Sequence, residues 1–343
     1  MARVTVRPFE RGDLDAAAVL VAEAHQRDRD RHPVLVEELA NEAEARSMLA
    51  KWLENERTDG AVAVDGDVLA GFLMGERVAG ASPDSYMGRL AHPRTVRVGP
   101  RDNAVAAGYD ARAVCRLLYR ELAGAWVAAG YYNHSVHLIE GEERLQDAWF
   151  NLGFGRTVSM SIREGTGPVA GVYAEDIEIR EAGSEDVEVL VGLARTLGLH
   201  HIGSPIFMYW PVLPEDDAVA RSLFSSLLED EGNPHFVAYR AGEPVGLTSF
   251  LKQGFFPPYV SPEKNVYLFM GIVEPEAQDG GVGRALLDRG MAWARGEGYE
   301  RCTLHVLSAN YSGEPFWFAN GFEPVEYTLE RQIDERVAWA RGG

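Results

Sequence analysis

The sequence predicts a mixed α/β protein that is built from two tandem copies of one domain. Three observations support this prediction. The chain has 343 residues, a length that suits two average domains. Its two halves resemble each other at a constant offset. In each half, strand-like segments alternate with helix-like segments, which is typical of α/β structure.

A single shift of 168 residues aligns the matching parts of the two halves and brings ten identical residues into register. Chance similarity rarely keeps one register over such a distance. We therefore expect an N-terminal domain at 1–163, a glycine-containing linker at 164–176 and a C-terminal domain at 177–343. The aligned segments are VCRLLYRELAGAWVAAGY (114–131) with VGRALLDRGMAWARGEGY (282–299), SVHL (135–138) with TLHV (303–306), and WFNLGF (149–154) with WFANGF (317–322).

Periodicity in the second copy predicts its elements in order. Alternating residues indicate strands, and apolar residues at helical spacing indicate helices. The predicted strands are 177–180, a hairpin over 235–252, 265–273, 301–307 and 323–331, and the predicted helices are 184–199, 215–230, 281–297 and 313–320. The first copy shows matching features, including a hairpin over 61–75.

Composition excludes several classes of protein. A formal net charge of −19 repels nucleic acid and anionic lipid. The two cysteines, Cys115 and Cys302, are far apart and have no metal-ligand spacing. No apolar run is long enough for a membrane helix, and the first residues lack a signal-peptide core. We expect a reduced, cytoplasmic protein with no metal, nucleic-acid or membrane partner.

The stretch VEPEAQDGGVGRALL (273–287) places three glycines between a predicted strand and a predicted helix. The first N–H groups of a helix have no partner within the helix, and the helix dipole adds partial positive charge, so this turn suits an anion such as phosphate. Two familiar phosphate motifs do not fit. Arg284-Ala285 follows Gly283 where a Walker loop needs Lys-Ser/Thr, and Leu286 stands where a dinucleotide loop needs its third glycine.

The same stretch resembles the acyl-CoA pyrophosphate loop of the GNAT N-acetyltransferases, which reads Gln/Arg-x-x-Gly-x-Gly/Ala after a Val-x-Pro strand end. Gln278, Gly281 and Gly283 match the loop, and Val273 and Pro275 match the strand end. The resemblance also includes Asn310, eleven residues before Gly321-Phe322.

This resemblance implies two tandem GNAT-fold domains, each with a mostly antiparallel, splayed sheet flanked by helices. It further implies an acetyl-CoA-dependent N-acetyltransferase that acts on a small-molecule amine. The backbone of Ile272 and Val273 would pair with the pantetheine arm. The implied cofactor-binding residues are Ile272, Val273, Gln278, Asp279, Gly280, Gly281, Val282, Gly283, Arg284, Asn310 and Trp317.

The catalytic acid and base are less clear, because the chain departs from the family pattern. Trp317 stands where the family often has a tyrosine, and an indole N–H is not a useful acid. The candidate catalytic residues are therefore Tyr267, Tyr311 and Asn310. Tyr267 occupies the strand position where some relatives carry a glutamate, and either orients the amine or lines the cleft. His305 has a counterpart in His137, so we assign it to the shared fold.

The segment LHHIGSPIFMYW (199–210) follows the first helix of the second copy, in a region that often forms the acceptor wall in this family. The expected acceptor contacts are His200, His201, Ser204, Tyr209 and Trp210. A loop that only covers the core is the alternative.

The first copy lacks the features of a cofactor loop. At the 168-residue shift, Gly281 and Gly283 fall on Ala113 and Cys115, and Gln278 falls on Asp110. Added Cβ atoms and a carboxylate would keep a pyrophosphate away. We therefore expect this copy to keep the fold without the cofactor.

Other functions stay open at this point. The protein could be a tandem enzyme like mycothiol synthase, an enzyme that acetylates antibiotic amines, or a non-catalytic acyl-CoA-binding sensor or scaffold. A purely structural pseudo-enzyme would bind no cofactor at all. The sequence does not distinguish a monomer from a homodimer.

Overall fold

The computed structural model describes residues 4–80, 82, 84–171, 173–230 and 232–341. The chain forms two compact units. Unit 1 contains Met1–Gly80, His92–Ser159 and Val325–Gly343, and unit 2 contains Ala81–Ala91 and Met160–Pro324. Each unit therefore includes a segment from the other repeat. The domain limits at 163 and 177 follow the sequence repeat and stay a prediction.

Unit 1 is an α/β sandwich around a sheet with the strand order β1-β2-β3-β4-β6-β13, in which β5 pairs with β3. Only the pair β4–β6 is parallel among the pairings given for this unit. Its elements are β1 (Thr5–Pro8), η1 (Arg11–Asp13), α1 (Leu14–Arg31), η2 (Glu38–Ala40), α2 (Glu42–Glu54), β2 (Thr58–Asp65), β3 (Val68–Ala79), β4 (Arg94–Val98), β5 (Asn103–Val105), α4 (Ala111–Ala128), β6 (Asn133–Ile139), α5 (Glu143–Phe150), the first half of β7 (Gly155–Glu164), most of β13 (Glu323–Gln332) and α10 (Arg336–Arg341).

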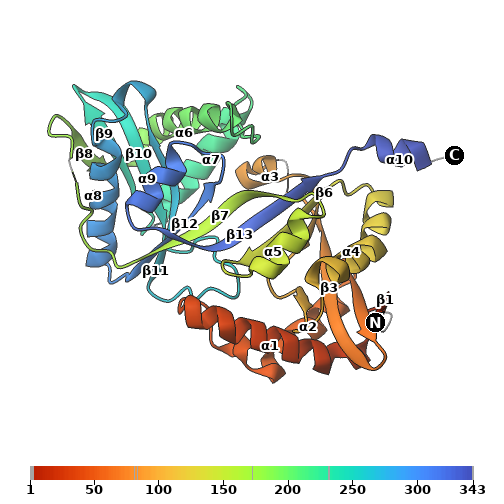
Figure 1. Ribbon diagram of the computed structural model, residues 1–343. Helices are drawn as coiled ribbons and strands as arrows, with labels where there is room; N and C mark the ends of the chain where they lie inside the picture. The colour runs from red at the N-terminus through yellow and green to blue at the C-terminus, as the bar shows by residue number, and fades with distance from the viewer. Residues whose placement is uncertain (1–3, 81, 83, 172, 231, 342–343) are drawn as a thin grey trace. The chain divides into compact units, whose positions relative to one another are not determined.

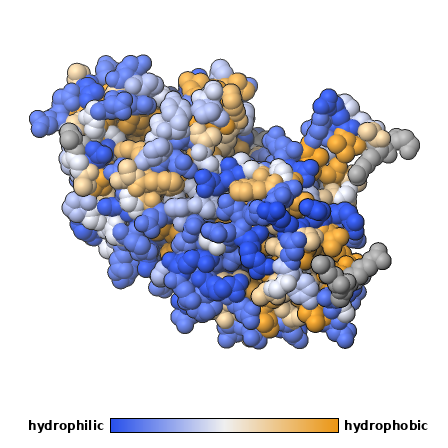
Figure 2. Space-filling view, viewed as in Figure 1, coloured by the Kyte–Doolittle hydropathy of each residue, from blue (hydrophilic) through white to orange (hydrophobic). Residues whose placement is uncertain are grey.

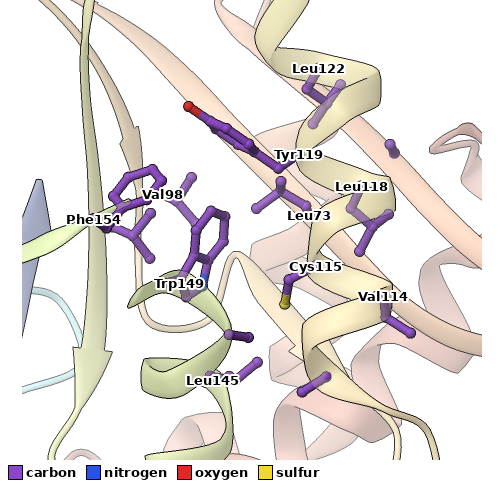
Figure 3. Close-up of a cluster of buried hydrophobic side chains, with 14 of the residues drawn as sticks. Leu73, Val98, Val114, Cys115, Leu118, Tyr119, Leu122, Leu145, Trp149 and Phe154 are labelled. Carbon is purple, nitrogen blue, oxygen red and sulfur yellow. The ribbon is translucent and has the colours of Figure 1, made fainter. Parts of the chain in front are cut away.

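Helices cover both faces of the sheet in unit 1 (Figure 1). On one face, α4 and α5 enclose a core that includes Tyr119, Trp149 and Phe154, whose rings meet edge to face, as Figure 3 shows. On the other face, α1 and α2 pack on β2 and β3 through Leu14, Leu49 and Phe72. The outer side of α1 is charged, and hydrophilic residues dominate that part of the surface in Figure 2.

Unit 2 has the matching strand order β7-β12-β11-β10-β9-β8, in which β11 and β12 are parallel and the pairings from β8 to β11 are antiparallel. Its elements are α3 (Tyr86–Leu90), the second half of β7, β8 (Glu178–Glu181), η3 (Ser184–Asp186), α6 (Val187–Ile202), α7 (Asp216–Glu229), β9 (His235–Arg240), β10 (Glu243–Leu251), β11 (Asn265–Val273), η4 (Pro275–Ala277), α8 (Val282–Gly296), β12 (Arg301–Leu307) and α9 (Gly313–Ala319).

Helices also cover both faces of the sheet in unit 2 (Figure 1). α8 packs on one face, where Leu286 and Met291 meet Phe236, Phe250 and other buried residues. α6 and α7 pack on the other face, where Leu190 and Phe224 meet residues such as Val237 and Met270. Tyr86 of α3 joins this second core, although it belongs to the first repeat.

The structure confirms the predicted fold class: a mixed α/β chain in which two units have matching strand orders. The repeat is visible in the strand limits, because β12 and β13 follow β6 and β7 at 168 residues at both of their ends. Some predicted limits were wrong. The hairpin predicted over 61–75 runs from Thr58 to Ala79. The first helix of the second repeat does not end at 199 but continues to Ile202, so His200 and His201 lie in its last turn rather than in a loop.

The parallel strands β11 and β12 separate partway along their length. They pair from Asn265↔Arg301 to Tyr267↔Thr303, and β11 then continues to Val273 along β10. The register of β10 with β11 shifts between Ser249 and Phe250, so that Phe269 is left over as a bulged residue. A bulge increases the local twist, which helps to turn β11 away from β12. The candidate site lies at the resulting opening between β11 and β12.

Candidate active site

The N-terminus of α8 forms the first part of the site. The chain enters the helix through Gly281, whose φ is +81°, a left-handed conformation that favours glycine. No side chain caps this end of α8. Its first N–H groups are therefore available to an anion, and the helix dipole favours negative charge there.

Neighbouring side chains hold the loop before α8 in place. Gln278 folds back and donates from Nε2 to the carbonyl of Val273 at 3.0 Å, which ties the loop to the end of β11. A Cβ on Gly280 would lie 3.5 Å from a terminal nitrogen of Arg240. Arg240 ends β9 and forms an ion pair with Asp176. The sequence patterns did not identify Arg240, because only the fold brings the end of β9 to this loop.

α9 lies beside the opening between β11 and β12. A Cβ on Gly283 would be 3.4 Å from the ring of Phe316, and a Cβ on Gly271 would be 2.9 Å from the ring of Trp317. Trp317 also packs edge to face against Phe316 and Phe322. Its indole therefore fills space next to β11.

Asn310 is buried just before α9, and its Oδ1 takes part in three hydrogen bonds, one of them from the hydroxyl of Ser312 at 3.3 Å. Its Oδ1 accepts from the backbone N–H of Gly313 at 2.8 Å and lies 3.0 Å from Nε2 of His200. Because Oδ1 is an acceptor, Nε2 of His200 carries the proton in this contact. Among the described residues no hydrogen bond is assigned to Nδ2 of Asn310, so this amide group is the part left for a ligand.

Tyr267 lies where β11 and β12 separate, and its hydroxyl is 2.9 Å from Nδ1 of His305 on β12. The rings of Phe255 and Phe256 pack edge to face against it. Burial raises the pKa of Tyr267 well above the ordinary value of a tyrosine. The hydroxyl therefore stays protonated near neutral pH and can orient a group by hydrogen bonding, but it does not act as a base.

The expected acceptor residues divide into two groups. His200 reaches Asn310, and its ring lies 5.9 Å from the ring of Tyr311, which is 66% exposed. His201 instead packs against Trp210, with ring centroids 4.5 Å apart, and burial together with the charge of His200 lowers its pKa to about 4. Ser204 and Tyr209 are exposed in the segment after α6.

Tyr86 was missed by the sequence patterns. Its hydroxyl accepts a hydrogen bond from Nε1 of Trp210 at 2.7 Å, and Arg89 of the same short helix forms an ion pair with Asp216. These contacts fix the segment after α6. A five-residue helix between glycine- and proline-containing loops gives no periodic signal from which its place could be predicted.

The corresponding helix in unit 1 begins differently. Oδ1 of Asp110 accepts from the N–H of Arg112 at 3.0 Å, so the side chain of this cap occupies the place where an anion would bind to α4. The strand that corresponds to β11 is interrupted at Gly99–Asp102 and continues only as the three-residue β5. Pro100 contributes to this interruption because proline has no N–H to donate.

Two searches of the described residues gave negative results. They contain no group of three or more His, Cys, Asp or Glu side chains placed to hold a metal ion. In the same part of the chain, no helix combines the length and apolar character needed to span a bilayer.

Comparison with known structures shows which proteins share this fold. A GCN5-related N-acetyltransferase from Sphaerobacter thermophilus matches over 97% of this chain and 96% of its own, with a TM-score of 0.55 and 14% identity. A GCN5-related glucosamine N-acetyltransferase region of a fungal multi-domain β-N-acetylglucosaminidase matches 96% of this chain and 38% of its own, with a TM-score of 0.53 and 12% identity. At these identities the likeness shows the fold alone.

Sequence comparison finds a family match in the second repeat. Residues 199–322 match the model of the acetyltransferase (GNAT) family. A search among curated protein sequences gave no match. The chain thus has the fold of GNAT proteins along nearly its whole length, and residues 199–322 carry the sequence features of the family.

Proposed function

We propose that unit 2 is the catalytic half and that it transfers an acetyl group from acetyl-CoA to the amine of a small-molecule acceptor. One observation carries this proposal: the uncapped N-terminus of α8 stands at the end of a strand that has separated from its parallel neighbour. Unit 1 has a self-capped helix and an interrupted strand at the matching place.

The residues present fit the cofactor. The N–H groups from Asp279 to Arg284 would hold the pyrophosphate, with Arg240 close to Gly280 as an additional cation. The edge of β11 near Ile272 and Val273 is not paired with β12 in the described structure, so its backbone groups could pair with the pantetheine arm. Acetyl-CoA, when bound, supplies the thioester whose acetyl group passes to the amine.

The side chains around the opening have distinct roles in this proposal. Nδ2 of Asn310 donates to the pantetheine or to the thioester oxygen, because Oδ1 is already used within the protein. The hydroxyl of Tyr267, fixed by His305, orients the amine or a water that receives its proton. Tyr311 is the exposed hydroxyl nearest to Asn310 in sequence and is the candidate donor to the leaving thiolate.

The acceptor would lie against the last turn of α6 and the segment after it. His200, Tyr209 and Tyr311 present side chains there, whereas His201 and Trp210 form the packed base. This wall contains aromatic and hydrogen-bonding groups, which suits a small amine. A tandem enzyme like mycothiol synthase and an enzyme that acetylates antibiotic amines are both compatible with it.

The first experiment is calorimetric titration of acetyl-CoA into the wild type, Gly283→Asp and Gly283→Ala. A Cβ at Gly283 meets its neighbours at 3.4 Å, so Gly283→Ala tests the added carbon and Gly283→Asp adds a carboxylate at the anion site. We expect one site per chain, affinity at least about tenfold weaker in Gly283→Asp, and a much smaller effect in Gly283→Ala. Two equal sites, or no binding to the wild type, would contradict the proposal.

A second candidate is a non-catalytic acyl-CoA sensor or scaffold. It is favoured by Trp317, whose packed indole replaces the tyrosine that often acts as the acid in this family. Both candidates bind the cofactor, so turnover distinguishes them. An enzyme releases CoA in the presence of an amine from a panel of small amines, faster than enzyme-free hydrolysis, whereas a sensor does not.

A further inference from the structure

Unit 1 contains a cavity that the proposed function does not use. Its volume is about 410 Å³, which is within the range of small-molecule sites. It lies between α1, the connection from β4 to α4, and the end of β6 with the start of α5. The parallel pair β4–β6 ends nearby at Val98↔Val136, so the cavity is located where the two strands separate.

The floor of the cavity holds a buried ionic cluster. Arg101 is only 4% exposed and pairs with the fully buried Asp28 at 2.6 Å. Arg31 pairs with the same aspartate at 2.6 Å, and Nε of Arg101 donates to Nδ1 of His25 at 3.0 Å. Two guanidinium groups thus share one carboxylate, and Glu142 is a second acidic group close enough to act on them. A buried charge of this kind is costly unless another group compensates it.

Two more arginines line the mouth of the cavity. Among the described residues neither Arg27 nor Arg144 has a carboxylate partner, although Arg144 donates to the carbonyl of Tyr109 at 2.8 Å. Three glutamates, Glu23, Glu142 and Glu143, also line the cavity. Burial, followed by the charge of Asp28, raises the pKa of Glu142, whereas Arg27, Arg101 and Arg31 lower it.

Apolar groups complete the wall. Leu20 and Ala24 of α1 face the cavity together with Val105 and Leu138. A cavity with convergent cations and an apolar wall suits a ligand that has an anionic group and a hydrocarbon part. It does not suit a pyrophosphate, because Asp110 already caps α4 at the neighbouring helix end.

We propose that this cavity binds a small organic anion, whose carboxylate or phosphate is held by Arg27, Arg101 and Arg144 and whose apolar part lies against Leu20 and Leu138. This site is separate from the acetyl-CoA loop of unit 2. It gives the first repeat a binding role of its own.

The test uses the full chain and three six-carbon probes: hexanoate, hexyl phosphate and hexylamine. Binding is measured by ligand-observed NMR on the wild type, on Arg27→Gln/Arg144→Gln and on Arg116→Gln. Arg116 is an exposed arginine of α4 that does not line the cavity, so it controls for the loss of charge. Circular dichroism checks that each variant is folded, and Gly283→Asp removes anion binding at α8.

We expect at least one of the two anions to bind, with the affinity reduced about tenfold or more in the double variant and within about twofold in Arg116→Gln and Gly283→Asp. If both anions bind, the cavity recognises negative charge in either group. If only one binds, the result shows whether the cavity prefers a carboxylate or a phosphate. The proposal is overturned if neither anion binds, if hexylamine binds as tightly, or if the double variant keeps full affinity. It is also overturned if acetyl-CoA fills a second site that the double variant loses.

Discussion

Nε2 of His200 lies 3.0 Å from Oδ1 of Asn310, which links the last turn of α6 to the residue that precedes α9. The same Oδ1 accepts the N–H of Gly313, and the hydroxyl of Ser312 lies 3.3 Å from it. Asn310 is therefore held in one orientation from two sides. Asn310, an expected cofactor contact, is therefore in direct contact with His200, an expected acceptor contact. A change at one of these side chains can affect the binding of both substrates.

The fixed orientation of Asn310 leads to the first prediction. Asn310→Asp keeps an oxygen for Gly313 and His200 but removes the free amide donor. We expect the affinity for acetyl-CoA to fall by about 3- to 30-fold, because one hydrogen bond is lost and a negative charge is added. Calorimetry measures this, and Asn151→Asp on the surface of unit 1 is the control. Unchanged affinity in Asn310→Asp would exclude Nδ2 from cofactor binding.

Tyr267 and His305 lead to the second prediction, which concerns turnover. Tyr267→Phe keeps the packing against Phe255 and Phe256 and removes only the hydroxyl. We expect kcat with an accepted amine to fall by about 10- to 100-fold, with the KM for acetyl-CoA within about twofold. Tyr299→Phe, which packs against Trp293 elsewhere in unit 2, serves as the control.

The pH profile separates an orienting role of Tyr267 from a role as base. Since burial raises the pKa of Tyr267, the wild-type and Tyr267→Phe profiles should have the same shape and differ only in height. Loss of a titration in the variant would mean that the hydroxyl itself ionises during turnover. A variant with the wild-type kcat would show that Tyr267 only lines the cleft.

The sequence was sufficient to predict most elements and the loop before α8. Local periodicity and the 168-residue repeat placed β11, β12 and α8 to within a residue. Periodicity reflects the local conformation of residues that are close in sequence, and the repeat is found by comparing the chain with itself. The length of helix α6 was underestimated because the pattern does not show that helical structure continues through His200 to Ile202.

Long-range placement could not be predicted. The sequence shows that β13 is a strand but not that it pairs with β6, because edge selection depends on packing across the chain. The same reason explains why Tyr86 and Arg240 were missed: Tyr86 reaches Trp210 across 124 residues. The expected roles of Gln278, Gly281 and Asn310 stay predictions until a ligand is measured.

The third prediction concerns stability in acid. His235 is completely buried beside Phe224, and neither ring nitrogen has a hydrogen-bond partner among the described residues. Burial lowers its pKa from 6.5 to about 4. The folded state therefore binds this proton less tightly than the unfolded state, so stability is fully present above about pH 6.5 and falls as the pH drops through 4.

Replacement of His235 by leucine should remove the two unsatisfied ring nitrogens and the loss of stability in acid that His235 causes. We expect His235→Leu to raise the free energy of unfolding by about 1 kcal/mol at pH 7, because two unsatisfied polar atoms leave the core. The loss of stability between pH 6.5 and 4 should also become shallower. Urea unfolding at pH 7 and pH 5 measures this, with His92→Leu on the surface of unit 1 as the control. A less stable His235→Leu would mean that the ring nitrogens are satisfied in solution.

The fourth prediction concerns a buried carboxylate in unit 1. Oδ2 of Asp102 accepts the N–H of Gly99 at 2.8 Å, and burial raises the pKa of Asp102 from 3.8 to about 6. The folded state thus binds this proton more tightly than the unfolded state. The contribution of Asp102 to stability is fully present below about pH 3.8 and is lost as the pH rises through 6, so the ionised form is unfavourable at pH 7.

Asp102→Asn keeps an oxygen for Gly99 and removes the charge. We expect the variant to gain about 1–2 kcal/mol in the free energy of unfolding at pH 7 and to gain little at pH 4, where the wild-type side chain is already largely protonated. Urea unfolding at the two pH values measures the difference. Asp67→Asn, in the exposed turn between β2 and β3, should show no such dependence. An equal gain in the free energy of unfolding at pH 7 and pH 4 would mean that Asp102→Asn acts through packing. An effect that comes from removing a titrating charge must differ between the two pH values.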